Sequence, residues 1–267
     1  MTINQLRGYA PLVLALLAAA VPATLQAQDR DEPRQPRRTR LMLGPQIVPR
    51  YPGADKTTIG PLVNIDRSSR EQPFAFEAPD ESAGFPLLNS GGFALGPAIS
   101  VQSSRRRRDT DGLLPKVGFT VEVGAAVQYT IVPAFRVRAE LRQGIGGHKG
   151  LVGMVGADYI ARDEDNWLFS VGPRVTLGNG RYSRAYYGVS TASAATSGLR
   201  AYDPGGGVRA VGATAGLLRQ LTEHWGVFGY ARYDRLVDDA GDSPVVRAFG
   251  SRNQLSGGIA ATYTFGG

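Results

Sequence analysis

The chain has 267 residues, among them 35 glycines, 17 prolines, 11 tyrosines, 10 phenylalanines and no cysteine. The lack of thiols excludes a disulfide framework, a Cys-ligated metal site and a thiol nucleophile. Two histidines, His148 and His224, leave little material for acid–base or metal chemistry. The 30 basic residues exceed the 23 acidic ones to give a formal charge of +7, and all but Lys56, Lys116 and Lys149 are arginine. This composition favours strands and turns over helices.

Residues 1–27 have the order of regions that is typical of a secretory signal peptide. A single charge, Arg7, precedes the apolar run Tyr9–Val21, and small and polar residues follow it. The apolar run is too short to cross a bilayer as a helix. We therefore predict cleavage after Ala27, with Ala23 as the alternative site. A buried N-terminal helix is the competing interpretation, but the charged segment that follows offers no core for it.

Residues 28–40 (QDRDEPRQPRRTR) are charged and rich in proline and arginine. Such a segment buries too little apolar surface to fold by itself, so we predict a disordered periplasmic tail after export. Its arginines could contact an anionic partner, although a solvated tail is the simpler interpretation.

From residue 41 onward the dominant signal has a period of two. In the segment 134–146, four apolar residues alternate with four charged ones: Phe135, Val137, Ala139 and Leu141 against Arg136, Arg138, Glu140 and Arg142. The segment 116–130 shows the same alternation with polar and small residues on one face. A strand places these two sets on opposite faces of a sheet. Four consecutive charges are incompatible with a dry core, whereas the wet interior of a membrane barrel accommodates them.

The pattern predicts an all-β fold, an antiparallel transmembrane β-barrel over residues 41–267 with about 12 strands, or 10 if the third and fourth are absent. The predicted strands are 40–50, 57–66, 72–78, 83–88, 92–103, 116–130, 134–146, 150–162, 166–179, 206–220, 224–237 and 253–265. Short connections such as 131–133 and 221–223 alternate with the longest ones, 104–115, 180–205 and 238–252. Outer-membrane barrels have short periplasmic turns and longer extracellular loops, so we expect the cell outer membrane as the location.

Several short motifs resemble the MipA/OmpV family, the outer-membrane relatives of the MltA-interacting protein. The matching pieces are Pro49-x-Tyr51-x-Gly53, Gly96-Pro97, Arg142-x-Gly144-x-Gly146-Gly147-x-x-Gly150-x-x-Gly153, Tyr186-Tyr187-Gly188-Val189, Ser197-Gly198-Leu199-x-x-Tyr202, Asp242-Ser243-Pro244-Val245-Val246 and Tyr263-x-Phe265. The resemblance implies a barrel that acts as a scaffold between a lytic transglycosylase and a murein synthase. It implies no set of functional side chains, and some relatives are treated as porin-like or adhesive.

A set of charged residues at inward strand positions is the first candidate site. It could line a narrow pore for small solutes, or it could form a network of ion pairs that fills the lumen. Side chains fill the interior of a barrel of about eight strands, whereas a barrel of about 16 strands has an open channel, and a barrel of 12 strands lies between these sizes. The predicted lumen-lining residues are Glu122, Arg136, Arg138, Glu140, Arg142, Asp158, Arg174, Arg232 and Asp234.

The run Arg105, Arg106, Arg107 and Arg108 falls in a predicted extracellular loop and is the second candidate. Guanidinium groups bind phosphates in a bidentate manner, so the run could contact lipopolysaccharide and other outer-membrane lipids; a solvated loop is the alternative. The run has no interleaved aromatic residues, so we expect no nucleic-acid partner.

We predict no catalytic residue, no cofactor and no metal site. A barrel hydrolase would need His, Ser and an acid together on one rim, whereas His148 and His224 fall at opposite ends of the predicted barrel. Asp238, Asp239 and Asp242 lack the order of a calcium loop. We therefore expect a protein that is not an enzyme.

Overall fold

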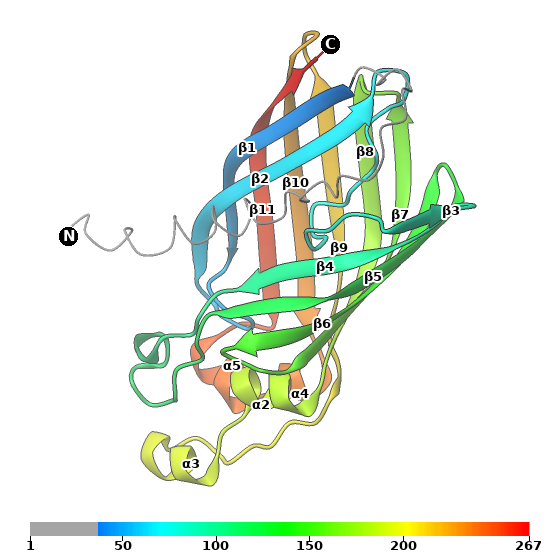
Figure 1. Cartoon of the computed structure of the whole chain (residues 1–267). Helices are drawn as coiled ribbons and strands as arrows, with labels where there is room; N and C mark the ends of the chain where they lie inside the picture. The colour runs from blue at the N-terminus through cyan, green and yellow to red at the C-terminus, as the bar shows by residue number, and fades with distance from the viewer. Residues whose placement is uncertain (1–36, 267) are drawn as a thin grey trace, which may run out of the picture. The chain divides into compact units, whose positions relative to one another are not determined.

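The computed structural model describes residues 37–266, so the predicted signal peptide and residues 28–36 of the predicted tail lie outside the described residues. The described chain forms one antiparallel sheet of 11 strands in the order β2-β1-β11-β10-β9-β8-β7-β6-β5-β4-β3 (Figure 1). The strands are β1 (Arg37–Pro49), β2 (Thr57–Ser69), β3 (Leu88–Ser90), β4 (Phe93–Gln102), β5 (Thr120–Val132), β6 (Phe135–Gly146), β7 (Leu151–Asp163), β8 (Trp167–Gly178), β9 (Gly207–Gln220), β10 (Trp225–Leu236) and β11 (Asn253–Phe265). β1 begins at Arg37, so residues 37–40 belong to a strand and not to the tail in which we expected them.

The period of two separates the side chains onto an apolar outer face and a polar inner face. Ile59 is 75% exposed on the outer face, whereas Arg136 and Arg174 on the inner face are 3% and 2% exposed. Apart from Leu88 and Val132, every large hydrophobic residue that is exposed within a strand has an odd number. An exposed apolar face that extends over the whole sheet is typical of a surface that contacts another apolar phase.

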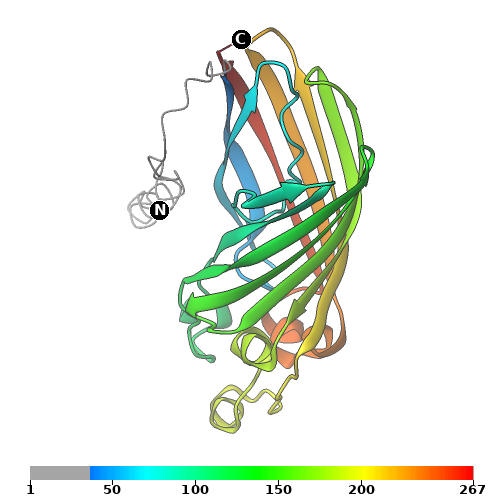
Figure 2. The same ribbon diagram turned by 45° about the vertical axis from the view of Figure 1, so that its right-hand side comes forward.

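The structure has 11 strands where we predicted 12 or 10, and the difference lies in the segment after β2. Neither 72–78 nor 83–88 is a strand, and only the short β3 follows them. Residues 72–82, here called the inner segment, lie on the inner side of the sheet, where the chain is drawn in cyan in Figures 1 and 2. Their alternating pattern reflects contacts with the inner wall and not a place in the sheet.

The two ends of the sheet do not pair with each other. Ala83 exchanges two backbone hydrogen bonds with Ile99, and Leu87 donates to the Leu95 carbonyl, so residues 83–90 cover the free edge of β4. The opposite end of the sheet is β2, which includes Pro61. Proline has no N–H to donate, so it is tolerated in an edge strand. The described sheet is therefore curled but open between β2 and β3.

Most connections are sorted by length between the two ends of the sheet, but 147–150 is a short connection among the long ones, and 70–87 is a long connection that begins beside the short turns. The short turns 133–134, 164–166 and 221–224 lie at one end of the sheet, here called the short-turn end, together with Phe265. The long connections 103–119, 179–206 and 237–252 lie at the other end, the long-loop end. Figure 1 shows both ends.

The long connections contain short helices that the sequence pattern did not indicate. They are η1 (Arg107–Thr110), α2 (Gly180–Tyr187), α3 (Thr191–Ser197), α4 (Asp238–Asp242) and α5 (Pro244–Phe249). Side chains cap three of them: Asn179 accepts from the Tyr182 N–H, Ser190 caps α3 and Ser243 caps α5. Helices of four to eight residues are too short to show a helical period, so capping residues are the sequence signal for the three that have them.

Candidate functional site

The inner segment brings Asp80 between two strands on the inner face of the sheet. Its carboxylate accepts hydrogen bonds from Arg174 Nε on β8 and from Arg232 Nη1 on β10, each at 2.8 Å. The side chains of Asp80 and Arg174 are 4% and 2% exposed. We placed residues 79–82 in an outer connection, so Asp80 is a site residue that the sequence interpretation missed.

Glu81 continues the same network toward β6 and β7. It forms an ion pair with Arg136, which also donates to Asp158 Oδ2 at 2.7 Å. Asp158 in turn accepts from Arg174 at 2.6 Å. The inner segment is thus joined through charged hydrogen bonds to residues of three strands, β6, β8 and β10.

Glu140 anchors the next part of the network. Its carboxylate accepts from the Ser82 hydroxyl at 2.6 Å and from Arg138 at 2.8 Å, and it also pairs with Arg142. Arg142 donates to Glu122 at 2.9 Å. The side chain of Glu140 is fully buried, and a carboxylate in that position needs these donors to remain ionised.

All nine predicted inward residues are brought together by the structure, and each has a partner of opposite charge. Arg232 pairs with Asp234 at 2.6 Å, which completes the set. The nine comprise five arginines and four acids, and Asp80 and Glu81 bring the acids to six. The inner face at this level is therefore nearly neutral, with the charges paired among themselves.

Aromatic side chains of the inner segment pack under the arginines. The Arg136 guanidinium lies 4.3 Å from the centre of the Phe76 ring, and that of Arg40 lies 4.0 Å from the Phe74 ring. Phe74 is 2% exposed. Cation–π contacts in a desolvated setting contribute about 2 kcal/mol each, so the inner segment is held by packing as well as by charge.

At the long-loop end, α2 carries three fully buried tyrosines, Tyr182, Tyr186 and Tyr187. A Cβ on Gly150 would lie 2.5 Å from the Tyr182 nitrogen, so glycine there permits the close approach of α2 to the turn after β6. Burial raises the pKa of Tyr186 well above its ordinary value. The tyrosines, together with Leu236 and other residues, form the main apolar cluster of this end.

His148 is buried beneath the same tyrosines. Its Nε2 lies 3.0 Å from Glu122 Oε1, and its Nδ1 accepts the Gly150 N–H at 3.0 Å. Both ring nitrogens are therefore engaged in structural contacts. His224 lies in a turn at the other end, where its Nδ1 is 3.0 Å from the Thr264 carbonyl. Within residues 37–266, no three His, Asp or Glu side chains are placed to hold a metal ion.

The arginine run divides into buried and exposed members. Arg105 is 3% exposed and donates to the Tyr186 carbonyl at 2.7 Å, so it cannot contact lipopolysaccharide as we had expected. Its burial depends on contacts distant in the sequence, because the backbone at Arg105 pairs with Val117 and its side chain reaches α2. Burial also lowers the pKa of Arg105. Arg107 and Arg108 are exposed on η1, and Arg106 is half-buried.

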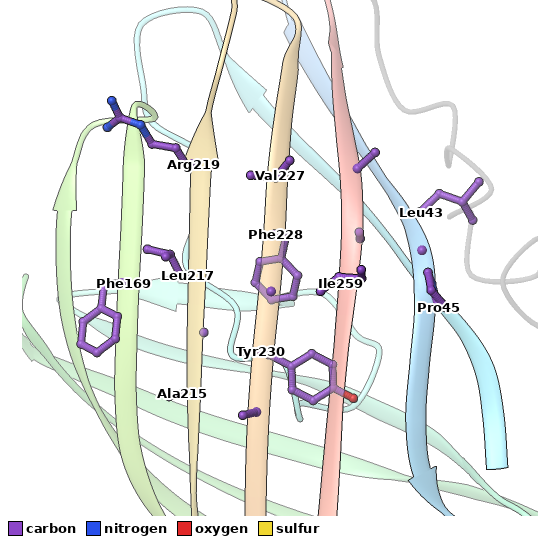
Figure 3. A pocket seen from close by; sticks show the side chains of 16 residues that line it. Leu43, Pro45, Phe169, Ala215, Leu217, Arg219, Val227, Phe228, Tyr230 and Ile259 are labelled. Carbon is purple, nitrogen blue, oxygen red and sulfur yellow. The ribbon is translucent and has the colours of Figure 1, made fainter. Parts of the chain in front are cut away.

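The apolar wall formed by β1 and β8–β11 has a groove of about 720 Å³ (Figure 3). Leu43, Leu217 and Ile259 line it from the outer face, and Phe228 and Tyr230 line it from the inner face. Small residues also line the groove: Ala215, Gly216, Gly229 and Ala231. The groove contains almost no polar surface, so it offers no chemistry beyond contact with apolar groups.

The outward apolar face and the inward charges define an outer-membrane β-barrel protein, and the outer membrane is its location. The chain belongs to the family of the MltA-interacting protein MipA, whose sequence model matches residues 41–265. No curated protein sequence matches the chain.

Solved structures show more distant similarity. The chain is similar to a bacterial polysaccharide outer membrane secretin (8% identity, TM-score 0.40, covering 88% of this chain and 100% of that one). It is also similar to OmpT, an outer membrane protein of Vibrio cholerae (10% identity, TM-score 0.36, covering 86% of this chain and 96% of that one). Outer membrane phospholipase A from Escherichia coli is similar as well (16% identity, TM-score 0.32, covering 88% of this chain and 94% of that one). Similarity at this level assigns no activity.

Proposed function

We propose that the protein is a non-conducting scaffold of the outer membrane that binds a lytic transglycosylase, together with a murein synthase, at its periplasmic end. The family supports the first partner, because it is the family of the MltA-interacting protein. The observation that carries the non-conducting part of the proposal is the place of the inner segment on the inner face of the sheet, where Asp80 and Glu81 are paired with wall arginines.

A conducting pore is the alternative that the inner segment disfavours. A channel selects ions through charges that face open water, whereas the arginines of this inner face are already paired with acids. Asp80 binds Arg174 and Arg232 together, and Glu81 binds Arg136. A solute would have to displace these pairs, which are costly to break in a buried setting.

The orientation follows from the lengths of the connections. Barrels of this class have short periplasmic turns, so we assign the short-turn end to the periplasm. β1 begins at that end, where the turns 133–134, 164–166 and 221–224 also lie. At the opposite end, Arg107 and Arg108 face the outer leaflet, where they contact lipopolysaccharide phosphates.

The scaffold is not an enzyme in this proposal. A hydrolase needs a histidine that is free to exchange a proton with a nucleophile. Both nitrogens of His148 are engaged by Glu122 and Gly150, and His224 lies in a turn at the other end of the sheet, against Thr264.

Binding of a purified lytic transglycosylase to the immobilised full chain tests the scaffold. We expect saturable binding in neutral detergent that an unrelated outer-membrane barrel does not show. A chain without residues 28–36 distinguishes the tail from the turns as the binding element. No binding to the full chain above the level of the unrelated barrel would contradict the proposal.

A further inference from the structure

A polar pocket of about 330 Å³ lies at the short-turn end, away from the network around Asp80. It is bounded by β1, by the end of β11 and by the turns that follow β7 and β9. The residues that line it are Arg38, Arg40, Asp165, Asn166, Gln220, Leu221, Thr222, Glu223 and Thr264. None of the contacts described for the inner network uses the polar atoms of Gln220, Glu223 or Thr264.

One wall of the pocket offers hydrogen-bond donors. The Arg40 side chain is 6% exposed, and its Nε has no hydrogen-bond partner among the described residues. The same holds, within residues 37–266, for the buried Nε of Arg38 and the buried hydroxyl of Thr264. Buried polar groups without a partner are rare in native proteins and call for an explanation, of which an ordered water or ion is one.

The nearby acids do not satisfy Arg40. Its contact with Asp165 is 3.6 Å long, beyond hydrogen-bond distance. Asp165 already accepts from Arg38 at 2.8 Å, from Arg162 at 3.1 Å and from the Phe74 N–H at 3.0 Å. One carboxylate is therefore shared by three guanidinium groups, and Arg40 has the weakest contact with it.

A second acid, Asp66, lies opposite Arg40 in the register of β1 and β2. Its carboxylate accepts from the Asn64 side chain at 2.8 Å. Within residues 37–266 Arg40 forms no hydrogen bond to Asp66, so its buried Nε stays without a partner although Arg40 lines the pocket.

The other wall offers acceptors. The Gln220 amide nitrogen donates to the Thr222 carbonyl at 3.0 Å, which fixes the orientation of the amide. Its Oε1 is buried and has no partner in the described part of the chain. Glu223 is exposed at the rim. A doubly charged anion such as phosphate would meet these acceptors unfavourably, whereas a ligand with a carboxylate and a neighbouring donor matches both walls.

We propose that this pocket binds a small zwitterion, either a free amino acid or a dipeptide. Its α-carboxylate contacts Arg40, Arg38 and the Thr264 hydroxyl, and its ammonium group faces Gln220 Oε1 and Glu223. Charge-assisted hydrogen bonds to guanidinium groups supply the affinity. The proposal does not depend on the scaffold function, because the pocket is built from residues of this chain alone.

Isothermal titration of the full chain in neutral detergent with alanyl-alanine tests the pocket. We expect saturable binding of the free dipeptide, and binding about tenfold weaker or worse for its C-terminal amide, which lacks the carboxylate. Arg40→Gln should abolish the difference between the two ligands. Arg235→Gln, an exposed arginine at the long-loop end, is the control that should bind as the parent does.

Thr264→Val keeps the proposal testable if Arg40→Gln does not fold, as judged by heat-modifiable migration in gels. The valine is close in volume and removes one donor, so binding should weaken about fivefold. Lack of saturable binding to the parent chain, equal binding of the amide, or unchanged binding by folded Thr264→Val would each overturn the proposal.

Discussion

Replacing Asp80 by asparagine removes the carboxylate that joins the inner segment to β8 and β10. The amide has nearly the same size but no charge, so the change tests electrostatics with little effect on packing. Arg174 donates two hydrogen bonds to this carboxylate, at 2.8 and 3.1 Å, and Arg232 donates one at 2.8 Å, so both arginines lose their charged partner at residue 80. Both arginines remain on the inner face with one fewer partner.

The expected loss is about 3 kcal/mol of the free energy of unfolding. Removing one partner of a buried ion pair costs about 3–5 kcal/mol, because it leaves an uncompensated buried charge. The lower end of this range applies here, since Arg174 keeps Asp158 at 2.6 Å and Arg232 keeps Asp234 at 2.6 Å. Asp242→Asn is the matched control: its carboxylate also pairs with two arginines, but its side chain is 62% exposed. Exposed pairs contribute less than about 1 kcal/mol.

Urea unfolding of the protein in lipid vesicles, followed by fluorescence of the two tryptophans Trp167 and Trp225, measures both variants. The slope of the unfolding free energy against urea concentration should stay the same, and the midpoint should fall for Asp80→Asn alone. Equal midpoints for the two variants would refute the reasoning, because they would show that Asp80 is not in a buried network.

Two further substitutions test the packing. Phe74→Ala should cost about 3–5 kcal/mol of the free energy of unfolding, because Phe74 is 2% exposed, whereas Phe85→Ala, at a residue that is 45% exposed, should cost far less in the same urea assay. Gly150→Ala should destabilise by about 1–3 kcal/mol, because its Cβ would lie 2.5 Å from the Tyr182 nitrogen. Gly60→Ala is its control, since a Cβ there meets no described atom within 4 Å; similar costs for the two glycines would contradict the close approach of α2.

The alternating faces could be predicted from the sequence because they depend on a local property. Successive side chains of a strand point to opposite faces, so the charges at Arg136, Arg138, Glu140 and Arg142 already indicated an inner face that is not dry. The positions of the long connections 103–119, 179–206 and 237–252 followed from the same segmentation, whereas the long connection 70–87 did not.

The inner segment could not be predicted in this way. Phe74, Phe76 and Ala78 alternate with other residues as they would in a strand, but Phe74 and Phe76 pack against the guanidinium groups of Arg40 and Arg136, and Ala78 is buried. Hydrophobic period reports which side chains share a face, and it does not report whether the backbone pairs with a neighbour. Asp80 was therefore missed. The predicted inward set had five arginines and only four acids, and this difference indicated that another acid would be needed to pair every arginine.

The arginine run shows the same limit of local reasoning. Arg105 and Arg107 are two residues apart in a run of identical side chains, yet one is buried and the other exposed. The pairing of Arg105 with Val117 decides which side chain turns inward. Contacts between residues distant in the sequence determine which arginine is buried, and these contacts cannot be predicted from composition.

Planar-bilayer conductance tests most directly the proposal that the chain is non-conducting because the inner segment pairs with the wall arginines. Purified full chain should give no discrete current steps under conditions in which a general porin does. A variant in which a short glycine-serine linker replaces residues 72–82 should conduct in uniform steps, since the wall arginines then face open water. Uniform steps from the full chain, of the same size as those of the variant, would contradict the account.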